Sequence, residues 1–89
     1  MKAAEAVRVL IVDDEENQRT GLAGMIGAWG YITETASNGE EALEKLAVFP
    51  AQILVTDLMM PRMDGAELLR RLNAQGGGPL AIVLTAFGS

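Results

Sequence analysis

Four short segments of the chain are apolar at nearly every position or rich in residues that favour extended structure. Residues 7–12 consist mostly of branched aliphatic side chains, and residues 53–55 and 80–84 repeat this composition. Residues 31–35 combine threonine with an aromatic and a β-branched side chain, which also favours a strand. Continuous apolar runs of this length are typical of strands covered on both faces. The pattern therefore predicts four strands, three of them buried.

The segment between the first two strands has a helical period. Its apolar side chains recur at the spacing of one helix face, at Leu22, Met25, Ile26 and Trp29. Gly30 follows directly, and glycine commonly occupies the position just beyond a helix. We therefore expect a helix that stops at Gly30 and places Trp29 in the core.

Two further helices are predicted from their caps and apolar stripes. Asn38 and Asp64 each precede a glutamate by three residues, which is the spacing of a capping box. Pro50 ends the second helix, and the glycine-rich residues 76–79 end the third. The apolar stripes are Ala42, Leu43 and Leu46 in the second helix and Leu68, Leu69 and Leu72 in the third. The chain thus alternates four strands with three helices.

This alternation predicts the fold class. A strand–helix repeat implies an α/β domain with a doubly wound parallel sheet and right-handed crossovers, here a single domain over residues 1–89. The apolar runs are too short to cross a bilayer, and the first residues lack the apolar stretch of a signal peptide. We therefore expect a cytoplasmic chain that does not contact a membrane.

Composition narrows the chemistry. The chain has no cysteine and no histidine, so thiol nucleophiles, Cys/His zinc sites and Ser-His-Asp triads are excluded. Lys+Arg number 7 against 12 Asp+Glu, a net charge of −5, and the basic residues form no run. Direct contact with nucleic acid is therefore not expected, and the excess of carboxylates favours cations instead.

Polar residues follow three of the predicted strands. Asp13 and Asp14 come after the first strand, Asp57 after the third and Thr85 after the fourth. The carboxyl ends of parallel strands share one edge, and neighbouring strands lie about 4.8 Å apart. If the first and third strands are neighbours, three carboxylates meet there and repel one another unless a cation neutralises them. Mg²⁺ suits a site of few carboxylates that leaves positions for water and phosphate.

Each acidic residue also has a structural interpretation. Asp13 and Asp14 precede a helix, whose macrodipole favours acids by about 0.3–1 kcal/mol each, and Asp57 could be a turn residue. The combination of an acidic pair, a single acid and a hydroxyl at three strand ends is harder to explain by turn chemistry. It favours phosphoryl transfer, with Asp57 as the nucleophile that forms an acyl phosphate and Asp13 and Asp14 as metal ligands.

At these residues the chain resembles the receiver domain of two-component response regulators. Three segments match its signature in order: residues 9–15 (VLIVDDE), 55–65 (VTDLMMPRMDG) and 82–86 (IVLTA). The resemblance covers about residues 7–89, and the ending LTAFG resembles an NtrC-like branch. It implies a flavodoxin-like strand order of 2-1-3-4 that lacks the last helix, strand and helix of the full receiver fold.

The resemblance also implies roles. Asp57 would accept phosphate from a sensor histidine kinase, and the chain would be a signalling module that switches an output domain or partner rather than an enzyme. Asp14, Asp57 and the backbone carbonyl of Met59 would bind Mg²⁺ directly, with Asp13 acting through water. Thr85 would be the switch hydroxyl that moves toward the phosphoryl group.

One departure keeps other interpretations open. The family carries a lysine after a fifth strand and an aromatic switch residue on that strand, and the chain has no counterpart of either; Lys2 and Lys45 are at unsuitable places. An alternative is therefore a truncated receiver that is not phosphorylated and acts as an interaction or oligomerisation module, with its fourth strand as an open edge. A phosphohydrolase with an aspartyl nucleophile is a further alternative, although such enzymes generally resemble Asp-x-Asp after the first strand.

Overall fold

The computed structural model describes residues 7–57, 65–75 and 80–84, and for residues 57, 65, 66, 73, 75 and 80–84 it describes the backbone alone. Its elements follow the predicted order of strands and helices. They are β1 (Arg8–Val12), α1 (Glu16–Ala28), β2 (Ile32–Ala36), α2 (Gly39–Val48), β3 (Ile53–Asp57), α3 (Gly65–Gln75) and β4 (Leu80–Leu84). Most predicted boundaries are correct within one or two residues, and β2 lies one residue later than expected.

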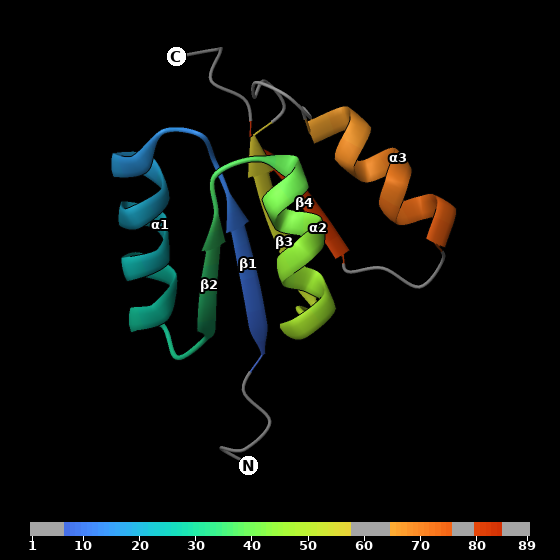
Figure 1. Cartoon of the computed structure of the whole chain (residues 1–89). Coiled ribbons are helices and arrows are strands. Elements are labelled where there is room, and N and C mark those ends of the chain that lie inside the picture. The colour runs from blue at the N-terminus through green and yellow to red at the C-terminus, as the bar shows by residue number, and fades with distance from the viewer. Residues whose placement is uncertain (1–6, 58–64, 76–79, 85–89) are drawn as a thin grey trace.

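The four strands form one parallel sheet in the order β2-β1-β3-β4, which confirms the predicted fold class (Figure 1). β1 pairs with β2 on one side and with β3 on the other, and β4 pairs with β3. Every strand therefore points the same way, and the carboxyl ends of the strands lie at the same edge of the sheet. Among the residues described, no helix is long and apolar enough to span a bilayer.

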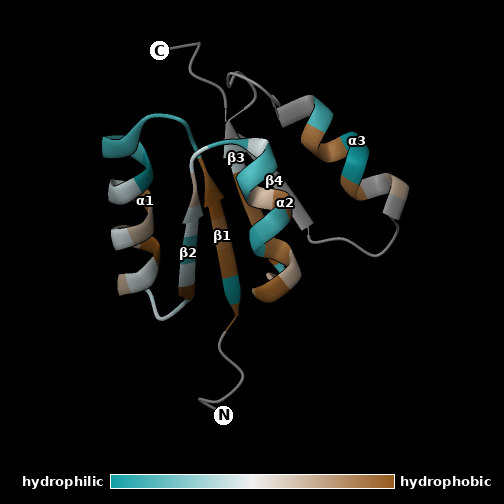
Figure 2. Cartoon of the chain, viewed as in Figure 1, coloured by the Kyte–Doolittle hydropathy of each residue, from teal (hydrophilic) through white to brown (hydrophobic). Residues whose placement is uncertain are grey.

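Alternate residues of the central strands pack against different helices. Leu10, Val12 and Leu54 belong to a core cluster with residues of α2 and α3. Val9, Ile11 and Val55 form a second cluster on the other face, packed against α1. β1 is almost entirely apolar between these two layers (Figure 2). Because it is covered on both faces, this strand shows the continuous apolar run that predicted it.

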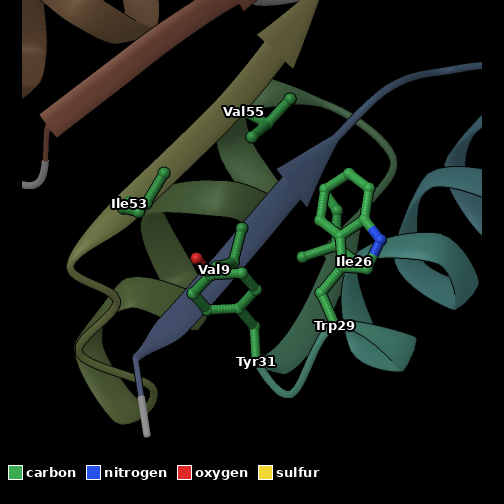
Figure 3. A pocket seen from close by; sticks show the side chains of 6 residues that line it. All are labelled: Val9, Ile26, Trp29, Tyr31, Ile53 and Val55. Carbon is green, nitrogen blue, oxygen red and sulfur yellow. The ribbon is translucent and has the colours of Figure 1, made fainter.

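The prediction that Trp29 lies in the core is wrong, because its side chain is 66% exposed. Trp29 caps the C-terminus of α1, and Gly30 beyond it has φ of 102°, the left-handed conformation that glycine adopts readily. The indole borders a shallow apolar pocket lined by Val9, Ile26, Trp29, Tyr31, Ile53 and Val55 (Figure 3). Helical spacing identifies the inner side of α1, but it does not say how far the sheet extends beneath it. Among the described elements α1 packs on β1 and β2, and its last turn borders this pocket rather than a packed core.

The start of α2 carries the predicted cap. Asn38 Oδ1 accepts a hydrogen bond from the Glu41 N–H at 2.8 Å. Glu41 in turn accepts bonds from the backbone N–H and the hydroxyl of Ser37, at 2.8 and 2.6 Å. The reciprocal bond of the capping box therefore reaches the residue before Asn38. These bonds from Ser37 hold the pKa of Glu41 below its ordinary value of 4.5.

We expect the Glu41 contacts to make the fold acid-sensitive. A carboxyl group whose pKa is lowered by folding stabilises the native state above its unfolded pKa, and this contribution is lost as the pH falls through the lower folded value. The unfolding free energy of Glu41→Gln should therefore fall less than that of wild type as the pH drops below about 4.5. Urea unfolding at several pH values measures it, and Glu44→Gln on the exposed side of α2 controls for the lost charge. Equal acid responses of wild type and Glu41→Gln would contradict this expectation.

Candidate functional site

The sheet register brings two acidic segments to the same edge. Val12, the last residue of β1, lies opposite Thr56, and Asp57 is the last residue of β3. Asp13 follows Val12 directly, so it stands level with the backbone of Asp57 on the neighbouring strand. Adjacent parallel strands lie about 4.8 Å apart. The predicted neighbourhood of the first and third strands is therefore confirmed at the level of the backbone.

Asp13 is held firmly at this edge. Its side chain and backbone leave it only 5% exposed. Its N–H donates to the carbonyl of Ala36 at 3.1 Å, which continues the pairing of β1 with β2. Its Oδ1 accepts a hydrogen bond from the Glu15 N–H at 2.9 Å. One oxygen of Asp13 therefore closes the turn before α1, a structural role that differs from the macrodipole interpretation made from the sequence.

The two acidic residues after Asp13 have different environments. Glu15 is the N-cap of α1, because its carboxylate accepts a hydrogen bond from the Gln18 N–H at 2.9 Å. Asp14 is exposed at the same edge as Asp13. The cap is thus provided by Glu15, and helix capping does not account for Asp14. An exposed carboxylate beside the end of β3 remains consistent with a metal ligand.

Part of the predicted site lies outside the residues that the structure describes. Met59 and Thr85 are in that part, and Asp57 is described by its backbone alone. The backbone of Leu84, the last residue of β4, lies opposite Asp57 in the register. Thr85 is the next residue in the sequence. Among the described side chains, no three His, Cys, Asp or Glu residues are grouped to hold a metal. The complete ligand set therefore stays a prediction.

The residues at this edge nevertheless fit Mg²⁺ by their chemistry. Asp13 and Asp14 provide carboxylate oxygens, which are the hard ligands that Mg²⁺ prefers. A third carboxylate belongs to Asp57, whose backbone lies on the adjacent strand. With few protein carboxylates, such an ion keeps positions for water and for phosphate oxygens.

Two basic residues near this edge were not assigned a role from the sequence. Arg19, on the first turns of α1, donates a hydrogen bond from Nη1 to the backbone carbonyl of Asp13 at 2.9 Å. It is the first cation after four consecutive acids, which is the only sequence signal that could have pointed to it. Lys45 donates to the Thr35 carbonyl at 2.6 Å and pairs with Glu34 at 3.3 Å. Lys45 therefore ties α2 to β2.

Comparison with known proteins gives consistent matches over the same residues. The model of the response regulator receiver domain family matches residues 9–89. Response regulator RR06 of Streptococcus pneumoniae is 42% identical over 82 residues, which are 92% of this chain and 37% of that protein. Response regulator MprA of Mycobacterium ulcerans is 43% identical over 84 residues, 94% of this chain and 36% of that protein. The chain thus spans little more than a third of the curated relatives it matches.

A solved structure matches the fold as well. Response regulator protein TrrA from Thermotoga maritima, in complex with Mg²⁺-BeF, is 35% identical with a TM-score of 0.85. The match covers 92% of this chain and 71% of that one. The family model and this solved structure thus agree over nearly the whole chain, in sequence and in backbone path. The chain therefore belongs to the response regulator receiver domain family, whose members are signalling modules rather than classical enzymes.

Proposed function

We propose that this chain accepts a phosphoryl group from a sensor histidine kinase onto Asp57, with Mg²⁺ bound, and thereby switches an output domain or a partner. Membership of the family implies a cognate histidine kinase. The observation that carries the proposal is the register of β1 and β3, which sets buried Asp13 beside the backbone of Asp57. The crystal structure of the similar protein TrrA in complex with Mg²⁺-BeF supports the proposal.

The proposed reaction uses residues that end or follow β1, β3 and β4 in the chain. A carboxylate oxygen of Asp57 attacks phosphorus, the P–N bond of the donor phosphohistidine breaks, and the imidazole leaves with the electron pair. Mg²⁺ supplies charge neutralisation for the phosphoryl oxygens. Asp13, Asp14 and Asp57 would hold the ion with the carbonyl of Met59, and the Thr85 hydroxyl would donate a hydrogen bond to the phosphorylated side chain.

The proposal is made at the level of the family. The narrower NtrC-like branch rests on residues 84–88 alone, and the similarity to RR06 and MprA does not favour it. The receiver segment is proposed to extend over residues 7–89 of the single domain 1–89. A role in transcription and the identity of the regulated process are not part of the proposal, because the chain matches little more than a third of RR06 and MprA.

Phosphorylation from a small donor tests the proposal. The wild-type chain is incubated with acetyl phosphate, with Mg²⁺ or with excess EDTA, and the covalent adduct is measured by intact mass. We expect one phosphoryl group per chain with Mg²⁺ and loss of the adduct with EDTA, because the acyl phosphate forms only where the charges are neutralised. An adduct that is indifferent to EDTA, or continuous phosphate release as from a phosphohydrolase, would contradict the proposal.

A second candidate function is supported by the surface beside α1. Trp29, Tyr31 and Ile32 are exposed there, between the end of α1 and the start of β2. A group of exposed apolar side chains favours contact with another protein surface, here proposed to be that of a second copy of this chain. The receiver would then act as an oligomerisation module. Absence of a Mg²⁺-dependent adduct, together with a molecular mass above that of one chain in sedimentation velocity, would favour this candidate.

A further inference from the structure

A side chain of α1 reaches back to the acidic edge, the carboxyl edge of the sheet where Asp13 and Asp14 follow β1 and Asp57 ends β3. The Arg19 backbone N–H donates to the Glu15 carbonyl at 2.9 Å, as expected inside the first turn of the helix. Its guanidinium is half-buried and donates from Nη1 to the Asp13 carbonyl, also at 2.9 Å. Arg19 therefore links the start of α1 to Asp13, the residue that follows β1.

The bonded carbonyl has a particular place in the chain. It belongs to the peptide unit that joins Asp13 to Asp14, and this unit is planar. An oriented carbonyl therefore fixes the direction in which the chain enters Asp14. Two further hydrogen bonds of Asp13 involve main-chain groups: its N–H donates to the Ala36 carbonyl, and its Oδ1 accepts from the Glu15 N–H. Arg19 adds a side-chain donor to these two, at the point between the two carboxylates.

We propose that Arg19 is a positioning residue for the Mg²⁺ site, which holds the peptide between Asp13 and Asp14 so that both carboxylates are directed at the ion. This inference rests on the proposed function. Arg19 does not touch the ion in this scheme and acts through the backbone of its neighbours. Groups that orient metal ligands commonly affect metal affinity by about 10–100-fold.

The charge of Arg19 makes the proposal sharply testable. A guanidinium near a cation site repels the cation, so a pure charge effect predicts that Mg²⁺ binds more tightly once Arg19 is removed. Positioning predicts the opposite sign, because the carboxylates lose their alignment. The two explanations therefore differ in direction and not only in size.

The experiment measures Mg²⁺ affinity by isothermal titration calorimetry for wild type, Arg19→Ala and Arg19→Lys. We expect the dissociation constant to rise about tenfold or more in Arg19→Ala. Arg19→Lys should lie between the two, because an ammonium group can donate to the same carbonyl without the fixed geometry of a guanidinium. Arg70→Ala is the matched control, since Arg70 is exposed on α3 and pairs with Glu67 at 2.5 Å. It removes the same charge and should leave the affinity unchanged.

A second measurement separates positioning from general destabilisation. The rate of adduct formation from acetyl phosphate is followed against Mg²⁺ concentration. A positioning role raises the Mg²⁺ concentration for half-maximal rate and leaves the rate at saturating Mg²⁺ near that of wild type. If Arg19→Ala does not fold, Arg19→Lys gives the same comparison. Unchanged or tighter Mg²⁺ binding in the folded variants overturns the inference about Arg19, whereas a wild-type chain that binds no Mg²⁺ overturns the proposed function itself.

Discussion

Asp57→Asn is expected to abolish the Mg²⁺-dependent phosphoryl adduct, to the background of the mass measurement. An asparagine amide is not a nucleophile toward phosphorus and cannot form an acyl phosphate. The same change removes one of three carboxylates from the proposed ion site, so Mg²⁺ affinity should fall as well. Intact mass after incubation with acetyl phosphate and Mg²⁺ measures the first effect, and calorimetric titration measures the second.

Glu44→Gln provides the matched control for this variant. Glu44 is exposed on α2, and its replacement removes one negative charge with the same change from carboxylate to amide. It should be phosphorylated as the wild type is. An adduct that persists in Asp57→Asn would identify another acceptor, and fragmentation of the adduct would show whether Asp13 or Asp14 carries it. That result would contradict the assignment of Asp57.

Leu54→Ala is expected to destabilise the fold by about 2–5 kcal/mol. Leu54 is fully buried at the centre of the sheet, in the cluster that joins β1 and β3 to α2 and α3. Its truncation removes buried apolar surface and leaves a cavity in this cluster, to which Leu10 and Leu68 also belong. Because the total stability of a domain is commonly about 5–15 kcal/mol, this is a large share. Urea unfolding followed by circular dichroism measures the change.

Val48→Ala is the control for the core substitution. Val48 is apolar too, but it is 83% exposed at the end of α2. Its replacement should change the unfolding free energy by no more than about 0.5 kcal/mol. A cost for Leu54→Ala that is no larger than this would mean that the layer between the sheet and α2 is not packed as described.

The succession of strands and helices could be predicted because each layer leaves a distinct local pattern. β1 is buried on both faces, so nearly all its residues are apolar, whereas α2 is covered on one side and its apolar positions follow the helical period. Asn38 was predicted as a cap from its spacing to Glu41, and the hydrogen bond between them is formed. The prediction that Trp29 is buried was wrong, because a periodic apolar stripe identifies the inner side of a helix but not what lies opposite each of its residues.

The acidic edge was predictable for a related reason. In a parallel sheet all carboxyl ends lie together, so the order of elements alone sends Asp13, Asp14 and Asp57 to one edge. The side chains of Asp57 and Thr85 and the carbonyl of Met59 lie outside what the structure describes, so their roles remain predictions.

The amino-acid sequence by itself determined the alternation of elements and the side of the sheet on which the carboxylates gather, since both follow from local periodicity and chain direction. Only the tertiary structure decided that Asp13 is buried with its carbonyl bonded to Arg19, and that Trp29 is exposed. These features depend on how far apart the elements lie and on which of their surfaces are covered. Both are set by the packing of the whole domain, and no short stretch of sequence encodes them.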